Sequence, residues 1–317
     1  MSGVMQGAEG VTCSGSRTTV VSVCFESAEI LPTMLASIPE GVPVVLVDNG
    51  STDVASIKAA ADRAGARLVC NDANRGFGAA CNQGAALAST EYVLFLNPDA
   101  RLGPGCIAAL EAAADGTRSA VAFNPAISAP GGQPSFKHRS VLLPRAAWLG
   151  RGQPDGDREV PVLSGAALFV RTSAFAAVGG FDENIFLYHE DDDLSLRLAT
   201  GRGALRFVKA AEVRHAGGRS SVRSPEVAAL KGWHMGRSRV YAARKHHRPW
   251  PFATALTVAL AQLASPLALL SPRKRAKQLG FLRGIWSMRA RVEPAVPRDS
   301  AAPGGLLDAR PRDRARP

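Results

Sequence analysis

Carboxylates stand at two places in this 317-residue chain where metal binding or proton transfer could occur. The first is Asp99, which Pro98 directs just beyond an apolar stretch, Tyr92–Leu96. Such a lone carboxylate can bind a divalent ion that keeps several waters and takes further ligands from phosphates, as Mg²⁺ prefers. Asn97-Pro98-Asp99 is also good turn chemistry, so the motif alone leaves a structural role open. His215, at the head of a glycine-rich loop, is either solvent-exposed or a ligand for metal or phosphate.

The second place is a run of four consecutive acids, Glu190 to Asp193. It begins a predicted helix over 190–200, where acids complement the positive end of the helix dipole. Asp193 can also pair with Arg197 one turn later, and this explains Asp193 and part of the role of Asp192. Crowded like charges raise the pKa of one member of the group, which suits a general base. The run therefore offers a candidate base without deciding which acid it is.

Two further segments place polar residues after predicted strands. Asp48 is a fixed acceptor suited to a base or ribose donor, because Ser51 or Asp53 already supplies the cap of the following helix. Farther along, Arg75 offers a planar fork to phosphate oxygens, and Gly76 lets the backbone come close to a ligand. These types of residue indicate a nucleotide site.

The elements that must position these residues alternate between strand and helix from Thr18 onward. The strands are continuously apolar, which is typical of βαβ units around a parallel sheet. We therefore predict an α/β fold, a three-layer α/β/α sandwich with a mainly parallel, Rossmann-like central sheet. Ligands of such sheets bind outside the carboxyl ends of the strands, so the polar segments should converge on one crevice. The predicted strands are 18–25, 42–48, 66–72 and 92–96, and the predicted helices are 29–38, 54–64, 78–89 and 105–114.

The regular pattern fails after residue 125. Residues 126–160 are rich in Pro, Gly and Arg and are expected to form loops with short strands. A strand, a short helix, a turn and the helix over 190–200, closed by Gly201, follow.

Charge and cysteine content limit the class of protein. The net charge is +11, but residues 231–317 alone hold 18 Lys and Arg against 4 Asp and Glu. That imbalance indicates a polyanionic partner, either nucleic acid or an anionic membrane surface, or else a solvated tail. Nucleic acid is disfavoured because the basic segment lacks interleaved aromatic residues. The five cysteines lack a disulfide or zinc spacing, and residues 1–17 read as a disordered lead-in rather than a secretory signal, so the cytoplasm is expected.

An uncharged stretch over 252–270 lies between Arg248 and the basic residues 273–277. At 19 residues it is nearly long enough to span a bilayer, although Gln262, Ser265 and Pro266 weaken that interpretation. A packing helix, an interfacial helix and a membrane span all remain open, and the cationic flanks favour the interfacial helix.

Five segments, in this order, resemble the family 2 glycosyltransferases of GT-A fold, and most of all their bacterial rhamnosyltransferase-like members. They are VDNGSTD, NRGFGAACNQG, FLNPDA, GGFDENIFLYHEDDDLSLRL and RHAGGRSS, and the resemblance covers about residues 18–223. It implies an inverting transfer of a sugar from a nucleoside diphosphate (dTDP or UDP), with dTDP-rhamnose the leading donor. The acceptor would be a hydroxyl of a cell-surface glycan or of a polyprenyl-diphosphate-linked sugar.

The resemblance also implies roles for single residues. Asp191 would be the catalytic base, with Glu190 beside it and Asp192 and Asp193 as competitors. Mg²⁺ or Mn²⁺ would be bound by Asp99 and His215. Many relatives have an aspartate where this chain has Asn97, although Asn-Pro-Asp is common in the rhamnosyltransferase-like members. The sugar nucleotide would contact Asp48, Asn49, Ser51, Asn74, Arg75, Gly76, Asn97 and Asp99.

The expected organisation follows from both lines of argument. Residues 18–230 would form the GT-A domain, with a nucleotide-binding half (18–125) and an acceptor half (126–230). Residues 231–291 would form a helical extension at the inner face of the cell membrane, and 292–317 a disordered basic tail. Two other classes of protein would differ from this pattern. A nucleotidyltransferase would need a glycine-rich basic loop where this chain has FESAE, and a catalytically inactive sugar-nucleotide-binding or membrane-surface scaffold would tolerate Asn at position 191.

Overall fold

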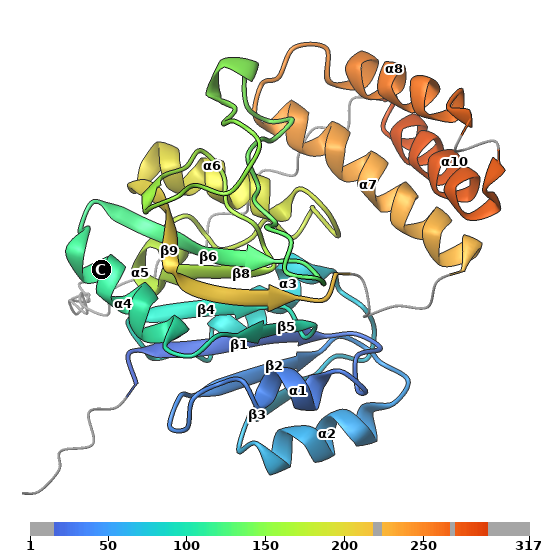
Figure 1. Ribbon diagram of the computed structural model, residues 1–317. Coiled ribbons are helices and arrows are strands. Elements are labelled where there is room, and N and C mark those ends of the chain that lie inside the picture. The colour runs from blue at the N-terminus through green and yellow to red at the C-terminus, as the bar shows by residue number, and fades with distance from the viewer. Residues whose placement is uncertain (1–15, 218–223, 267–269, 291–317) are drawn as a thin grey trace, which may run out of the picture.

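The computed structural model describes residues 16–217, 224–266 and 270–290 (Figure 1). Most of the expected lead-in and the whole expected tail over 292–317 lie outside these residues. Arg17, the last residue of the expected lead-in, forms ion pairs with Glu91 and Asp115.

A nine-stranded sheet forms the centre of the molecule, and its strand order is β3-β2-β1-β4-β8-β6-β9-β5, with β7 paired to β9. Strands β1 to β4 are parallel to their neighbours within that group, as predicted. Strand β8 is antiparallel to β4 and β6, β9 is parallel to β6, and β5 and β7 are antiparallel to β9. The elements of this domain are β1 (Thr18–Cys24), α1 (Leu31–Leu35), β2 (Val44–Asp48), α2 (Val54–Arg63), β3 (Arg67–Cys70), α3 (Phe77–Ala85), β4 (Tyr92–Leu96), β5 (Ala100–Leu102), α4 (Cys106–Gly116), β6 (Ala120–Ser128), the 3-10 turn η1 (Arg145–Ala147), β7 (Arg158–Glu159), β8 (Ala167–Arg171), α5 (Thr172–Ala177), α6 (Glu190–Gly201) and β9 (Ala204–His215).

Alternate residues of the central strands enter two different cores, and this produces the three layers. Val20 and Leu46 face a core shared with α1, α2 and α4. Their neighbours Val21 and Val45 face the opposite core, which contains residues of α3, α5 and α6. Both faces of β1, β2 and β4 are therefore buried, which explains the continuous hydrophobicity of these strands. The predicted α/β/α sandwich is confirmed.

The register of the sheet brings the polar strand ends together. Cys24, Asp48 and Cys70 pair side by side at the carboxyl ends of β1, β2 and β3. The end of β4 aligns with the start of β8, because Leu96 pairs with Ala167. The segments that follow β1, β2, β3 and β4 therefore leave from the same edge of the sheet.

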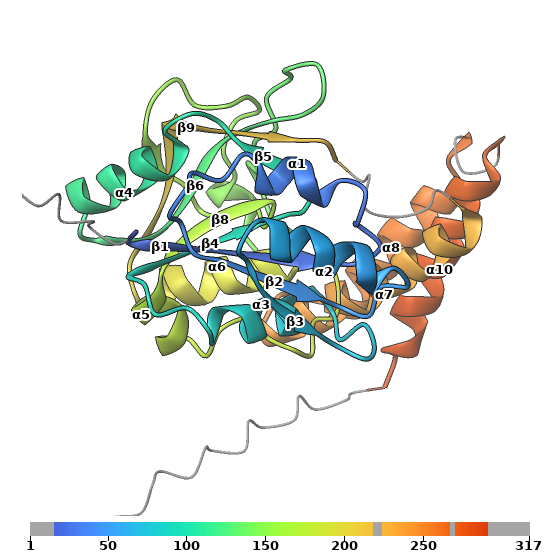
Figure 2. The ribbon, with the colours of Figure 1, turned by 90° about the horizontal axis from the view of Figure 1, so that it is seen from below.

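In the described part of the C-terminal region, three helices form a separate group beside the sandwich: α7 (Pro225–Lys245), α8 (Pro251–Leu263) and α10 (Pro272–Ser287) (Figures 1 and 2). Val240, Ala259 and Phe281 belong to a small core that these helices share. Helix α8 ends at Leu263, inside the apolar stretch over 252–270, and among the described helices none has the length and hydrophobicity that crossing a bilayer requires. Helix α7 runs without interruption across the predicted limit at residue 230, and the domain limits stay predictions.

Candidate active site

Asn49 joins the end of β2 to the loop before α3. Its side-chain Nδ2 donates to Asn74 Oδ1 at 3.0 Å and to the Gly76 carbonyl at 3.2 Å. Its Oδ1 accepts from the Arg75 backbone N–H at 3.0 Å and from Asn71 Nδ2 at 3.1 Å. Because Asn49 is itself buried, these bonds fix the loop over 71–76 beside the strand end. The structure thus brings Asn49, Asn74, Arg75 and Gly76 together, as the resemblance implied.

Asp48 lies fully buried at the tip of β2. Its carboxylate accepts long bonds from the Ser51 N–H, at 3.3 and 3.4 Å. Ser51 Oγ in turn accepts from the backbone N–H of Glu26, in the loop after β1. Asp53 caps α2 by accepting from Ser56, as the sequence predicted, so Asp48 is not needed as a cap. Its contact with a nucleoside stays a prediction.

The glycine at position 76 is required by close packing and by its backbone angle. Its φ is +92°, and a Cβ there would lie 2.7 Å from the Phe186 carbonyl oxygen. The neighbouring Phe77 N–H donates to that oxygen at 3.1 Å, so the loop docks on the segment before α6. Arg75 is exposed, and its guanidinium has no partner among the residues that the structure describes. It is available to a ligand.

Asp99 and His215 face each other at the strand ends. Asp99 Oδ1 lies 3.0 Å from His215 Nε2, and Asn97 Nδ2 lies 3.3 Å from the same nitrogen. The pairing of β5 with β9 creates this contact, because Ala100, next to Asp99, is opposite His215 in the ladder. Within the described ranges no three His, Cys, Asp or Glu residues gather as a metal cage. The pair supplies two ligands, which fits an ion that takes its others from a substrate and water.

Lys231 of α7 adds a positive charge near this pair, and no motif in the sequence indicates it. Burial and the nearby Arg273 and Lys277 lower the pKa of Lys231, while the charge of Asp99 acts in the opposite direction. The C-terminal helices therefore contribute cations next to the strand-end site.

Asp191 is held from two sides. Its Oδ2 accepts from the Gly165 N–H at 2.9 Å and lies 2.6 Å from Lys137 Nζ. Lys137 also contacts Asp192 Oδ1 at 2.9 Å. Burial disfavours the charged ammonium, but the two carboxylates outweigh burial and raise the pKa of Lys137. Lys137 comes from the irregular loop between β6 and β7, so no motif or period in the sequence could have identified it.

Asp193 points away from the other acids and is fully buried. It forms ion pairs of 2.8 Å with Arg197, as predicted, and also with Lys245 and His246 at the end of α7. Burial disfavours its charged form, but these partners outweigh burial and lower the pKa of Asp193 to about 2. With every oxygen engaged by a cation, Asp193 is a structural anchor and not a candidate base.

Glu190 and Asp192 have opposite environments. Burial and the adjacent charge of Asp191 raise the pKa of Glu190 to about 8, and Glu190 Oε2 is buried without a hydrogen-bond partner among the described residues. Asp192 bonds His189 at 2.9 Å, and although burial acts against ionisation, Lys137 and His189 hold the pKa of Asp192 well below its usual range. Tyr188 and His189, with φ of +67° and +71°, form the strained turn before these acids.

A cavity of about 330 Å³ opens over the acids. One wall is formed by Lys137 and by the residues from Tyr188 to Asp192. The other wall comes from the C-terminal helices and contains Met235, Arg239, Gln262 and Phe281. The helical extension therefore completes this part of the site, which the sequence did not reveal.

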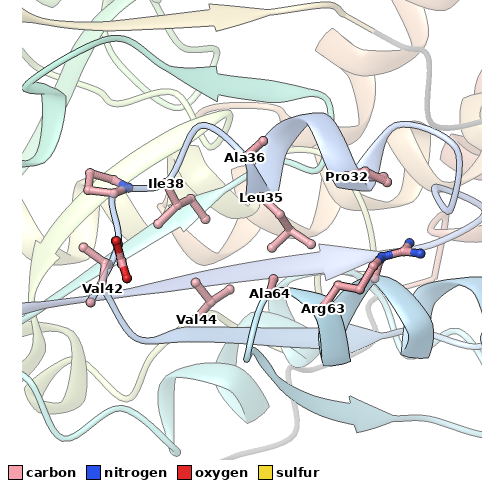
Figure 3. Close-up of a pocket in the computed structure, with 12 residues that line it drawn as sticks. Pro32, Leu35, Ala36, Ile38, Val42, Val44, Arg63 and Ala64 are labelled. Carbon is pink, nitrogen blue, oxygen red and sulfur yellow. The ribbon is translucent and has the colours of Figure 1, made fainter.

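A second hollow, of about 360 Å³, lies between α1 and α2 (Figure 3). Leu35, Ile38, Val42, Val44 and Ala64 are among its lining residues. Val44 is the first residue of β2 and Val42 lies just before the strand, whereas Asp48 is its last residue. No predicted site residue lines this hollow.

Comparisons with known proteins agree with this arrangement. The sequence profile of glycosyl transferase family 2 matches residues 19–179. The N-acetylglucosaminyl-diphospho-decaprenol L-rhamnosyltransferase of Mycobacterium tuberculosis is 33% identical over 294 residues, which are 82% of this chain and 95% of that protein. The pre-mycofactocin glycosyltransferase of the same species is 27% identical over 312 residues, or 88% of this chain and 64% of that protein.

Solved structures have the same fold. A mannosyltransferase from Pyrobaculum calidifontis, in complex with GDP-Man and Mn²⁺, has a TM-score of 0.55 at 18% identity, over 86% of this chain and 88% of that one. Residues 1–349 of TarS from S. aureus, in complex with UDP-GlcNAc, give 0.51 at 17% identity, over 85% and 90% of the two chains. The GT-A fold is thereby confirmed, and the chain is a glycosyltransferase that belongs to glycosyl transferase family 2.

Proposed function

We propose that this enzyme transfers L-rhamnose, with inversion, from dTDP-rhamnose to a hydroxyl of an N-acetylglucosaminyl-diphospho-polyprenol. The observation that carries the proposal is a short hydrogen-bonded link between two sites. The Asn97 N–H donates to the Ala166 carbonyl at 3.0 Å, and the adjacent Gly165 N–H donates to Asp191 at 2.9 Å. The strand-end pair Asp99 and His215 thus lies next to the candidate base, as a displacement between a diphosphate and a hydroxyl requires.

The donor diphosphate would lie at the strand ends. Asp99 and His215 would bind the divalent ion, and the imidazole ligand favours Mn²⁺ over Mg²⁺. The ion would neutralise charge that grows on the leaving diphosphate. Arg75, which is exposed at the neighbouring loop, would contact the base or diphosphate, and Lys231 would add positive charge near Asp99.

The acceptor hydroxyl would lie in the cavity beside Asp191. Asp191 would take the proton as the oxygen attacks the anomeric carbon from the face opposite the diphosphate, so no covalent intermediate is needed. Lys137 and the Gly165 N–H fix the direction of this carboxylate. The relative's name supports this class of acceptor, since that protein acts on a sugar linked through a diphosphate to decaprenol.

We also propose that the C-terminal helices hold the enzyme at the cytoplasmic face of the membrane. Residues 231–290 contain 12 Lys and Arg and no Asp or Glu. A lipid-linked acceptor would be reached at such an anionic surface.

The test is transfer by the purified enzyme with Mn²⁺ and a synthetic N-acetylglucosaminyl-diphospho-prenol. The donors compared are dTDP-rhamnose, UDP-galactofuranose, UDP-glucose and GDP-mannose, with products analysed by mass spectrometry and the new linkage by NMR. We expect a rhamnosylated product with inverted configuration, and at least about 100-fold slower transfer by Asp191→Asn. A product from another donor alone would overturn the assignment of rhamnose. No product from any donor, with no thermal shift from any nucleotide, would favour the inactive scaffold.

A further inference from the structure

Arg239 is a cation of the cavity that no described residue neutralises. It lies on α7, in the cavity wall opposite the acids. The side chain is partly buried, and its guanidinium forms no hydrogen bond or ion pair with any described residue. Burial lowers the pKa of Arg239, and no carboxylate of the described residues opposes that shift. A partly buried guanidinium without a counter-charge is costly, so its position calls for an anion that the described residues do not supply.

The ionised carboxylates of the cavity have partners of their own. Asp191 and Asp192 share Lys137, and Asp192 also contacts His189. Glu190, whose pKa is raised to about 8, is mostly neutral near pH 7 and carries little charge for Arg239 to balance. Among the described residues, Arg239 is therefore the charged group of the cavity that lacks an ion-paired or hydrogen-bonded partner.

Other basic residues of α7 differ from Arg239 in having partners. Arg237 is exposed and lies over the ring of Trp233, 4.6 Å from its centroid. Arg244 donates to the Met288 carbonyl at 2.6 Å, and Lys245 pairs with Asp182 and Asp193. Packing explains these residues, but it does not explain Arg239.

The size and lining of the cavity indicate what kind of anion it would accept. A volume of about 330 Å³ is at the small end for ligand sites, so it suits a head group rather than a whole lipid. Met235 and Phe281 add apolar surface on the same wall as Arg239. A guanidinium fork matches two phosphate oxygens, and the apolar surface matches the first prenyl unit.

We propose that Arg239 binds the diphosphate of a prenyl-diphosphate-linked acceptor while the sugar of that acceptor lies at Asp191, so that Arg239 selects acceptors that carry a diphosphate. This inference rests on the proposed function. It assigns the acceptor's diphosphate to the wall of the C-terminal helices, apart from the strand-end pair that serves the donor.

Kinetics with two acceptors test the assignment. One is N-acetylglucosaminyl-diphospho-farnesol, and the other is octyl N-acetylglucosaminide, which has an apolar chain but no diphosphate. For Arg239→Ala we expect KM for the diphosphate acceptor to rise roughly 10- to 100-fold, as the loss of a charge-assisted contact predicts. The kcat value, the donor KM and the kinetics of the octyl acceptor should stay within about twofold of wild type. Arg239→Lys should restore part of the loss, because an ammonium keeps the charge without the fork.

Arg237→Ala is the matched control, since it removes a guanidinium from the same helix outside the cavity, and it should behave as wild type with both acceptors. Equal losses by Arg239→Ala on the two acceptors would show a structural role and overturn the proposal. A raised donor KM would instead assign Arg239 to the donor, with the same consequence.

A binding measurement separates failure of this inference from failure of the proposed function. Farnesyl diphosphate is titrated into the enzyme saturated with dTDP and Mn²⁺, and farnesol serves as the uncharged probe. Wild type should bind farnesyl diphosphate at least 10-fold more tightly than Arg239→Ala does, and the two should not differ with farnesol. Equal binding of farnesyl diphosphate by both proteins would overturn the inference even if transfer proceeds. Selective binding without transfer would retain the diphosphate site and reject the activity.

Discussion

At the scale of single residues, four adjacent acids acquire different roles because a helix turns about 100° per residue. Asp191 and Asp193 are two residues apart, so their side chains leave α6 on nearly opposite sides. Asp191 faces the cavity with Lys137, whereas Asp193 faces the end of α7 with Lys245 and His246. The sequence showed the cluster, but the division of roles depends on partners more than 50 residues away in the chain.

This division predicts opposite effects of two similar substitutions. Asp191→Asn should lower kcat roughly 10²- to 10⁴-fold, the usual contribution of a general base, and keep stability and nucleotide binding. Asp193→Asn should leave Arg197 without a carboxylate partner and Lys245 with Asp182 alone, and it should reduce the free energy of unfolding by about 3–5 kcal/mol. Urea denaturation and steady-state transfer assays measure both effects. If Asp193→Asn were as stable as wild type, the ion-pair anchor would be wrong.

Glu190 predicts a pH dependence of stability. Its pKa is raised from its ordinary value of 4.5 to about 8, so between these values the folded state holds a proton that the unfolded state releases. Stability from this group is therefore lost as the pH rises, by about 1.4 kcal/mol per pH unit at most. Glu190→Gln removes the titration, so its melting temperature should gain on that of wild type from pH 5 to pH 8. Parallel melting curves over that range would contradict the raised pKa.

Sequence carries the most information where the type and the position of a residue both point to a role. Asp48, Asn49 and Asp99 lie at or just after the ends of apolar strands, as the strand-end rule expects of ligand-binding residues, and their roles stay predictions. Lys137 and Arg239 carry no such signal, because one lies in an irregular loop and the other is one of many basic residues on a helix. Their importance arises from burial and from missing or present counter-charges, which only the folded chain defines.

At the scale of elements, local pattern was most informative where both faces of a strand are buried. The four parallel strands β1 to β4 lie where the continuous apolar runs predicted them. Strand β5 was missed because its three residues directly follow the turn at Asp99, and its pairing with β9 is long-range. The predicted helix over 29–38 shrinks to α1, Leu31–Leu35, whose first turn contains Pro32. Short elements depend on tertiary pairing more than on propensity.

Helices α7 and α10 approach each other through glycines at a spacing of four. A Cβ on Gly236 would clash with the Phe281 carbonyl, and a Cβ on Gly284 would clash with the Trp233 carbonyl. Each helix carries a second such glycine, Gly232 in α7 and Gly280 in α10. Absence of side chains at these positions allows direct contact of the two backbones, which the sequence spacing alone does not distinguish from chance.

Filling this seam should separate the two helices. Gly284→Leu should cost about 1–3 kcal/mol of stability, the usual range for overpacking, and displace the helices that carry Arg239 and Phe281. KM for the lipid-linked acceptor should therefore rise together with the loss of stability, while nucleotide binding persists. Gly116→Ala in α4 is the control, because a Cβ there meets nothing within 4 Å. Equal stability of Gly284→Leu and wild type would show that α7 and α10 tolerate separation.

At the scale of the whole molecule, charge and apolar surface divide between the sandwich and the helical group. Among the described residues, five large hydrophobic side chains are more than half exposed, and all belong to the C-terminal part: Leu230, Trp250, Leu260, Leu270 and Trp286. The same part carries the excess of Lys and Arg. Tryptophan and leucine beside basic residues are typical of surfaces that enter the headgroup region of anionic membranes.

Vesicle binding tests this surface. The enzyme should sediment with vesicles that contain 30% phosphatidylglycerol, bind much less to pure phosphatidylcholine, and lose affinity as salt rises, because exposed charges are screened within about 10 Å at 0.1 M. Substituting Trp250, Leu260 and Trp286 together by serine should weaken binding roughly 10-fold or more, since each buried side chain contributes about 1.5–3 kcal/mol at most. Val141→Ser, at an exposed apolar residue of the sandwich, should bind as wild type does. The triple variant should keep its activity on octyl N-acetylglucosaminide, because these residues do not line the cavity. Equal sedimentation of the triple variant and wild type would mean that another surface meets the lipid, and binding insensitive to salt would remove the basic helices from the explanation.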